Sequence, residues 1–294
     1  MAESPSDEGC VACGWTLDRQ NRCSYCSHIK VIYTAHNRGV WSIGSDFILK
    51  ERPNDGPREE VTTLNYLAAN TKIPIPKVIR DWVDRNDRYF LLEERIDGQT
   101  LGAAWPSLSD EQKVSIAEEV ADVHKYLLQR MTSTSMQTVD QGPCRLEMLF
   151  FDQEPREPFH SDLELWDAIS RTLHSPPEKV FPQRALDNLK KRFPKCEPYV
   201  LSHCDLDLEN IMVKDGKLVA ILDWEYSAYL PVWYEYISAL WGFSDMGVEW
   251  NRMLRPRLGV HEDAKDFAMD LFYSREYPNL DEKGREVLER LSSE

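Results

Sequence analysis

The sequence predicts an α+β protein of two lobes, a small β-rich lobe followed by a larger, mainly helical one. Short β-like runs separated by turn residues occur before residue 98, and apolar residues at helical spacing occur after it. Two Cys-x-x-Cys pairs near the N-terminus add a third feature, a small zinc ribbon ahead of both lobes. The expected domains are therefore residues 1–28, 29–98 and 99–294.

Length and composition set the limits within which this fold is expected. The chain has 294 residues, enough for about two compact lobes, and 42% of them are hydrophobic, which is typical of folded proteins. Its net charge of −15 argues against nucleic acid as the main ligand, because binding to a phosphate backbone requires a positive surface. No apolar run approaches the roughly 18–20 residues of a membrane span, and the first residues are acidic and polar, so we expect a cytoplasmic protein.

The N-terminal segment has too few apolar side chains to form a core of its own. Its four cysteines are Cys10, Cys13, Cys23 and Cys26. Two Cys-x-x-Cys turns can bring four thiolates to one tetrahedral Zn²⁺, which would be structural because no position stays open for a substrate. Two local disulfides or two redox-active motifs are the alternatives, and a reducing cytosol favours zinc.

The β-rich lobe is predicted from residue 31 onward. Residues 31–50 contain three short β-like runs with two turn-like breaks, and residues 59–69 read as a helix with its apolar side chains mostly on one side. Two further β-like runs, 77–83 and 89–96, flank a polar turn and end at Asp97-Gly98. Together these elements make a small sheet with one helix.

The helical lobe is predicted to begin with a long amphipathic helix. Ser109 and Gln112 form a capping box, and apolar residues recur at helical spacing after it. His124 lies on the apolar face of this helix and is interpreted as a core histidine without a chemical role. Residues 162–173 and 184–193 are further helical segments.

Residues 199–225 carry the side chains that indicate chemistry. An apolar strand leads into an acidic loop, and two β-like runs, 211–213 and 218–222, follow it. Asp215-Gly216 joins these runs and is a strong hairpin signal, because this pair tolerates the positive φ angles of a tight turn. The sequence therefore predicts a hairpin directly after the acidic loop.

A hairpin brings its two outer ends together, so Asn210 at the entry and Asp223 at the exit are expected near each other. Such oxygen ligands suit Mg²⁺, which is usually held by one or two carboxylates and the phosphates of a nucleotide. Asp205, a few residues upstream, could orient an acceptor hydroxyl and take its proton. An ordinary acidic surface loop is the alternative, but the spacing of His203, Asp205 and Asn210 before the hairpin favours a functional site.

The motif His203-x-Asp205-Leu-x-x-x-Asn210, followed by Ile-Leu-Asp223-Trp-Glu, resembles the aminoglycoside phosphotransferase and choline kinase-like family, and most closely its fungal branch. The resemblance extends over about residues 31–245 and includes Lys50 in the run Phe-Ile-Leu-Lys. It implies a bilobal, protein-kinase-like fold, in which the small lobe covers ATP and the helical lobe supplies catalysis and the acceptor pocket.

The same resemblance implies roles for individual residues. Lys50 would contact the nucleotide phosphates and Glu60 would pair with it, although a solvated strand lysine is the alternative interpretation of Lys50. Glu94 and Ile96 would offer backbone groups to adenine. In the helical lobe, the expected roles are a catalytic base for Asp205, Mg²⁺ ligands for Asn210 and Asp223, and bracing of the catalytic loop for His203. Separately, Glu225, Glu235, Tyr236, Trp241 and Asp245 are candidates for the acceptor pocket, with packing or a surface position as the alternative for each.

Three departures from the family pattern occur in the catalytic loop. Cys204, Asp207 and Leu208 stand where members often have Gly, His and Pro, which makes the loop more acidic and less rigid. No glycine-rich phosphate loop is evident near Gly39 or Gly44. We expect an ATP-dependent phosphotransferase acting on a hydroxyl of a small molecule. A catalytically weak scaffold that binds nucleotide, or a protein partner through the zinc ribbon, is the alternative, and a protein kinase is less well supported.

Overall fold

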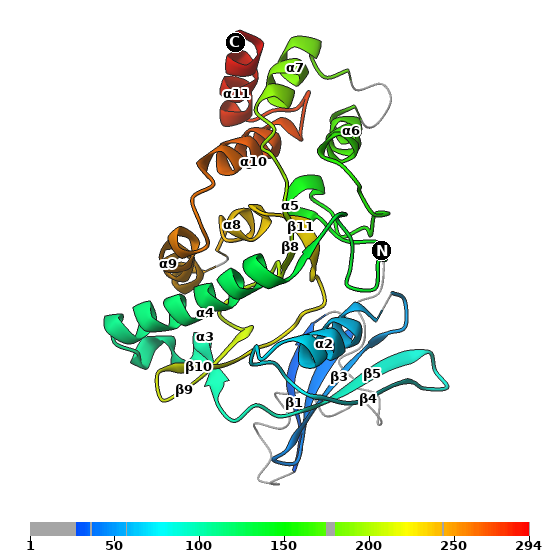
Figure 1. Ribbon diagram of the computed structural model, residues 1–294, viewed down its shortest axis with the longest axis vertical. Coiled ribbons are helices and arrows are strands. Elements are labelled where there is room, and N and C mark those ends of the chain that lie inside the picture. Colours follow the sequence, from blue (N-terminus) through cyan, green and yellow to red (C-terminus); the bar gives the residue numbers. More distant parts are fainter. Residues whose placement is uncertain (1–27, 36, 57, 175–179, 243, 294) are drawn as a thin grey trace, which may run out of the picture.

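The computed structural model describes residues 28–293 apart from residues 36, 57, 175–179 and 243. An antiparallel sheet with one helix forms the N-lobe, and a mainly helical C-lobe packs beside it (Figure 1). This confirms the predicted α+β fold of two lobes. The four cysteines of the expected zinc ribbon, Cys10, Cys13, Cys23 and Cys26, lie outside the described residues, so the ribbon stays a prediction.

The N-lobe sheet has five strands in the order β1-β2-β3-β5-β4, each antiparallel to its neighbours. The strands are β1 (Ile29–Ala35), β2 (Arg38–Ile43), β3 (Phe47–Pro53), β4 (Val78–Val83) and β5 (Arg88–Glu94). They occur where the β-like runs predict them, with ends that differ by a few residues. The last strand ends at Glu94 rather than at Ile96, which leaves Ile96 in the connection to the C-lobe.

The helix α2 (Glu59–Asn70) joins the N-lobe sheet to the C-lobe. Its Val61 packs with Tyr89 and Leu91 in a small N-lobe cluster. Its Leu64 and Leu67 are fully buried and belong instead to the large core of the C-lobe. Burying such a side chain contributes about 1.5–3 kcal/mol, so α2 is held by both lobes at once.

The C-lobe is built from helices around one large hydrophobic core. The helices are α3 (Leu101–Ala104), α4 (Asp110–Arg130), α5 (Glu147–Phe150), α6 (Asp162–Leu173), α7 (Gln183–Lys191), α8 (Tyr234–Ser238), α9 (Asp245–Leu254), α10 (Glu262–Ser274) and α11 (Glu282–Ser293), with 3₁₀ turns at Trp105–Ser107 and Arg255–Arg257. The predicted capping box is confirmed, since Ser109 and Gln112 bond reciprocally at the start of α4. His124 is buried on the inner face of α4, as expected of a core histidine.

Two small sheets lie in the C-lobe and pack against the long helix α4 (Figure 1). One contains β6 (Gln99–Thr100), β9 (Ile211–Lys214) and β10 (Lys217–Ile221), and the other contains β7 (Thr132–Ser133), β8 (Tyr199–Ser202) and β11 (Ala228–Pro231). The sequence predicts β8, β9 and β10 but not the other three strands. The two-residue strands β6 and β7 are too short to show a periodicity that distinguishes them from loops.

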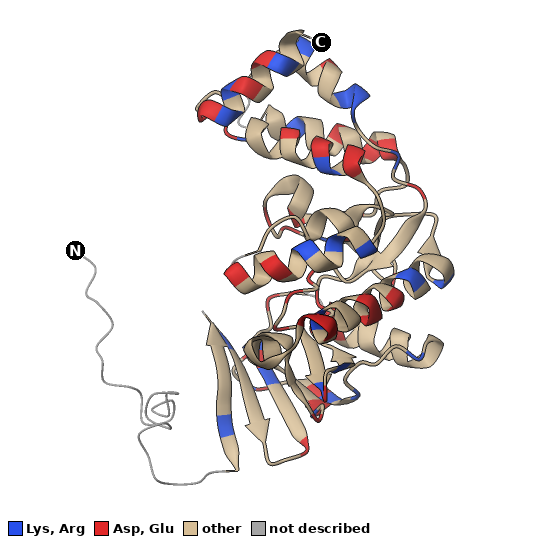
Figure 2. Ribbon diagram, turned by 90° about the vertical axis from the view of Figure 1, so that its left-hand side faces the viewer, with Lys and Arg blue, Asp and Glu red and all other residues tan. Residues whose placement is uncertain are grey.

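Charged residues of both signs are interspersed along the C-lobe helices (Figure 2). None of the helices in the described ranges combines the length and the apolar character needed to span a lipid bilayer.

The turn of the β9–β10 hairpin allows a test of local backbone strain. Gly216 has φ +74°, and a Cβ there would collide with the side-chain amide of Gln112, whereas Gly44 has φ +64° with open space around it. We expect Gly44→Ala to lower the free energy of unfolding by about 1 kcal/mol from the backbone alone. Gly216→Ala should cost more, about 2 kcal/mol, because Gln112 must also move. Urea denaturation measures both, and equal losses would contradict a role for Gln112.

Candidate active site

The hairpin β9–β10 places the predicted site residues at its two ends. Ile211 pairs with Ile221, and the Leu222 N–H donates to the Asn210 carbonyl at 2.8 Å. Asn210 at the entry and Asp223 at the exit therefore lie at adjacent ends of one hairpin, as the Asp-Gly turn predicts. Asp223 adopts a positive φ of 59°, a conformation that Asp tolerates better than most residues.

Asn210 holds Asp205 by its side-chain amide. Its Nδ2 donates to the Asp205 Oδ2 at 2.8 Å and to the Asp205 carbonyl at 3.0 Å. The amide nitrogen is therefore used within the loop, and the amide oxygen is the atom that would be available to a cation. Burial raises the pKa of Asp205 to about 6, and the carboxylates of Asp223 and Asp207 add to this effect while the bond from Asn210 opposes it.

His203 connects the catalytic loop to the hairpin. Its Nδ1 accepts the Asp205 N–H at 3.2 Å, so the ring proton is on Nε2, which donates to the Leu222 carbonyl at 2.7 Å. The ring of Trp224 packs edge-on against it at 4.6 Å. Burial lowers the pKa of His203 to about 4. A neutral ring with both nitrogens occupied positions the loop and has no nitrogen left for a substrate.

Glu235 on α8 lies beneath the same loop and is only 2% exposed. Its carboxylate accepts the His203 N–H at 2.6 Å and the Cys204 N–H at 3.2 Å. Glu235 therefore serves the loop backbone rather than the acceptor pocket for which the sequence made it a candidate. Cys204 has a positive φ of 75°, which explains why glycine suits this position better. Sequence alone could not show that these distant groups meet.

Lys50 of β3 lies where the two lobes meet. Its Nζ forms an ion pair with Glu60 of α2, lies 3.7 Å from the Asp223 Oδ1, and lies 4.0 Å from the Glu93 Oε2. The structure thus brings Lys50, Glu60 and Asp223 together and does not support a solvated strand lysine. Glu93 was missed, although its place in the alternation of Tyr89, Leu91 and Glu93 assigns it to the buried face of β5.

Opposite charges control the ionisation of this cluster. Burial lowers the pKa of Lys50, but Asp223, Glu60 and Glu93 together raise it well above its ordinary value. Burial raises the pKa of Glu60 and of Glu93, and the ammonium of Lys50 opposes both shifts. One ammonium therefore faces three carboxyl groups, an arrangement that favours uptake of a proton or of an added cation.

The two predicted adenine contacts lie in and after the last N-lobe strand. Glu94 ends β5, its N–H donates to the Lys77 carbonyl at 2.9 Å, and its side chain pairs with Lys77 at the surface. Its N–H is thus used by the sheet, and the carbonyl is the backbone group that could face a base. Ile96 is half-buried in the link between the lobes.

Residues 34–268, most of the chain, match the phosphotransferase enzyme family. The chain belongs to this family. A comparison with curated protein sequences found no match.

Solved structures of aminoglycoside phosphotransferases share the fold. A thermostable mutant of aminoglycoside phosphotransferase APH(4)-Ia, in a ternary complex with AMP-PNP and hygromycin B, has a TM-score of 0.58 at 15% identity over 94% of both chains. The streptomycin–ATP–APH(2″)-IIa complex has a TM-score of 0.56 at 14% identity over 90% of this chain and 91% of that one. ADP-bound APH(2″)-Ib has a TM-score of 0.54 at 13% identity over 94% and 95%.

Within the described ranges of the chain, no group of three or more His, Cys, Asp or Glu side chains is arranged to hold a metal ion. Asn210 and Asp223 supply one amide oxygen and one carboxylate. Such a pair fits Mg²⁺ only if phosphate oxygens or water complete the coordination, which is the usual way proteins bind Mg²⁺ with a nucleotide.

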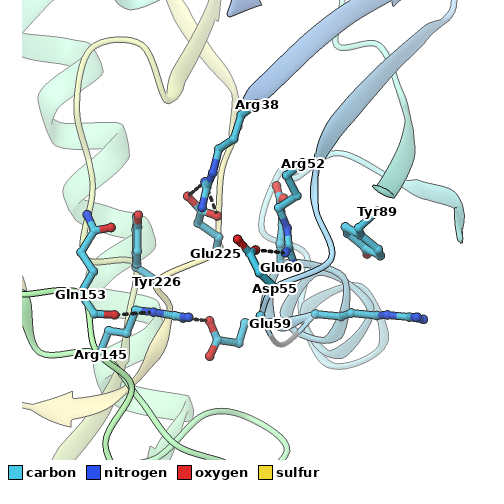
Figure 3. A pocket seen from close by; sticks show the side chains of 12 residues that line it. Arg38, Arg52, Asp55, Glu59, Glu60, Tyr89, Arg145, Gln153, Glu225 and Tyr226 are labelled. Atoms are coloured by element: carbon cyan, nitrogen blue, oxygen red, sulfur yellow. Dashed lines mark hydrogen bonds and ion pairs between the residues drawn. The ribbon is translucent and has the colours of Figure 1, made fainter. Parts of the chain in front are cut away.

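A pocket of about 210 Å³ lies between the lobes next to the Lys50–Glu60 pair (Figure 3). Its charged lining includes Arg38, Arg52, Arg145, Glu59, Glu60 and Glu225. Two ion pairs cross from lobe to lobe here, Arg38 with Glu225 at 2.7 Å and Arg145 with Glu59. Neither pair was foreseen from the sequence, because the partners are far apart along the chain.

His203 should make the stability of the protein fall in weak acid. Its pKa of about 4 in the folded protein lies below the ordinary 6.5, so below pH 6.5 the unfolded chain takes up a proton that the folded protein excludes. This contributes a loss of about 2 kcal/mol at pH 5 relative to pH 7. His203→Gln should remove that part of the loss. Urea denaturation at both pH values measures it, with His124→Gln as a matched comparison, since burial also lowers the pKa of His124 to about 4.

If wild-type protein and His203→Gln lost equal stability between pH 7 and pH 5, the neutral, buried state of His203 would be contradicted.

Glu235 should be required for an ordered catalytic loop. Glu235→Ala leaves the buried N–H groups of His203 and Cys204 without their acceptor, which should cost about 2–3 kcal/mol of unfolding free energy. Glu235→Gln keeps one acceptor oxygen and should cost about 1 kcal/mol. Chemical denaturation compares the two variants, and an alanine variant as stable as the glutamine variant would contradict this role.

Proposed function

We propose that this phosphotransferase transfers the γ-phosphoryl group of ATP, with Mg²⁺, to a hydroxyl group of a small molecule. One observation carries the proposal: Lys50 of the N-lobe lies 3.7 Å from Asp223 of the C-lobe, at the end of the hairpin whose entry holds Asp205 through Asn210. The Lys50 ammonium, the Asp223 carboxylate, the Asn210 amide and the Asp205 carboxylate thus lie close together at the junction of the lobes.

The excess of carboxylates around Lys50 supports a nucleotide site of this kind. A bound Mg²⁺ would supply the positive charge that neutralises the phosphates, and Asn210 and Asp223 are the residues that would hold it. Lys50 would then bind phosphate oxygens, with Glu60 fixing the direction of its ammonium group. The carbonyl of Glu94 and the backbone of Ile96 are the groups that we assign to adenine.

Asp205 is the residue that we assign to the acceptor. Its carboxylate takes the proton of the acceptor hydroxyl while the hydroxyl oxygen forms a bond to the γ-phosphorus. The bond from that phosphorus to the oxygen that bridges it to the β-phosphate breaks, and ADP leaves with the electron pair. His203 and Glu235 hold the loop, so most of the rate gain comes from positioning and charge.

The class of the acceptor follows from the family only as far as a small molecule with a hydroxyl group. The complexes with hygromycin B and with streptomycin belong to proteins about 15% and 14% identical to this chain. One fold serves many acceptors, so an antibiotic is not assigned here. A cytoplasmic location and a partner bound by the N-terminal segment stay as expectations from the sequence.

Asp205→Asn should slow phosphoryl transfer by about 10²–10⁴-fold, because the variant cannot take the hydroxyl proton. Nucleotide binding should persist. Asp207→Asn is a matched control in the same loop, since Asp207 accepts the Glu209 N–H through an oxygen that asparagine retains. Transfer is measured by mass spectrometry of products from a panel of hydroxyl compounds with Mg²⁺-ATP.

Full activity of Asp205→Asn would exclude Asp205 as the base. If wild-type protein bound nucleotide without Mg²⁺ and transferred no phosphoryl group to any compound or to water, a scaffold would replace the enzyme as the better interpretation.

A further inference from the structure

Arg38 places a second N-lobe cation at the edge of the candidate site. It is the first residue of β2, and its Nη1 donates to both carboxylate oxygens of Glu225 at 2.7 and 2.9 Å. Glu225 lies two residues after Asp223, which faces Lys50. Two N-lobe cations thus face two carboxylates of one short C-lobe segment.

The sheet register puts both cations on the same face of the N-lobe. Lys50 of β3 pairs with Val40 of β2, and paired residues of neighbouring strands project to the same side. Arg38 precedes Val40 by two residues and so shares that face. A ligand held by Lys50 beneath the sheet would have Arg38 as its neighbour toward the end of β2.

Asn37, the residue directly before Arg38, is bound by an arginine of strand β5. Arg88 of β5 donates to the Asn37 side chain at 2.7 Å and to the Asn37 carbonyl at 2.9 Å, and it also pairs with Glu51 at 2.9 Å. The backbone before Arg38 is therefore fixed to the body of the sheet. The Arg38 side chain is 50% exposed, so it can change partner without disturbing the turn.

We propose that Arg38 binds the phosphates of the nucleotide, and that Glu225 is the ion-pair partner of Arg38 when no nucleotide is bound. An exposed ion pair contributes little to stability and is easily exchanged, whereas a guanidinium binds phosphate oxygens by strong, charge-assisted hydrogen bonds. Arg38 then supplies the phosphate contact that a glycine-rich loop would otherwise provide. The inference rests on the proposed nucleotide site at Lys50.

The test compares three compounds that share adenosine and differ only in the number of phosphates. Dissociation constants of adenosine, ADP and ATP are measured by titration calorimetry with Mg²⁺ present. Arg38→Ala should weaken ATP binding by about 10–100-fold, the scale of one charge-assisted hydrogen bond, and leave adenosine binding unchanged. Arg80→Ala is the control, because Arg80 is an exposed arginine on β4, at the opposite edge of the sheet order from β1 and β2.

Glu225→Gln distinguishes a phosphate ligand from a simple contact between lobes. If Arg38 binds phosphate, Glu225→Gln leaves ATP affinity equal or tighter, since it removes only the competing partner. If the ion pair merely holds the lobes together, Arg38→Ala and Glu225→Gln weaken ATP binding alike, and the proposal is overturned. Thermal melting of each variant verifies that it is folded.

Two outcomes separate this inference from the proposed function. ATP affinity that falls in Lys50→Ala but equals wild type in Arg38→Ala overturns only the role of Arg38. Absence of nucleotide binding in the wild-type protein overturns the nucleotide site, and the role of Arg38 with it.

Discussion

The backbone of Leu222 is the point on which the candidate site depends. Its N–H donates to the Asn210 carbonyl, and its carbonyl accepts a hydrogen bond from the His203 ring. Leu222 therefore connects the start of the hairpin to the catalytic loop. Asp223 follows directly and takes its direction from that anchored position. The site is thus held together by hydrogen bonds that the Leu222 backbone makes to the Asn210 carbonyl and to the His203 ring.

Electrostatic attraction also brings the residues of the site together. The Lys50 ammonium attracts carboxylates from α2, from β5 and from the segment after β10, three elements that are otherwise separate. Burial of these carboxyl groups disfavours their charged form, as the raised pKa values of Glu60 and Glu93 show. In the proposed function, a nucleotide with a divalent cation would bring phosphates to Lys50 and positive charge to Asp223.

Local signals in the sequence were sufficient for the hairpin, the capped helix α4 and the N-lobe sheet. Asp215-Gly216 acts through its own backbone preferences, and the box at Ser109 closes within one turn, so neither depends on distant residues. Glu235 beneath the loop and Arg38 opposite Glu225 depend on partners 31 to 187 positions away. Such pairings follow from how the lobes are placed together, which no local pattern encodes.

The division of α2 between two cores bears on how the protein unfolds. The N-lobe cluster around Val61, Tyr89 and Leu91 is small, while the other side of the same helix is sealed into the C-lobe through Leu64 and Leu67. If α2 left with the sheet, Leu64 and Leu67 would be exposed and the larger core would lose apolar cover, and if α2 stayed behind, the side that carries Val61 would be exposed. The described lobes should therefore melt as a single cooperative unit, and a fragment cut between them would lack the interior that either half requires.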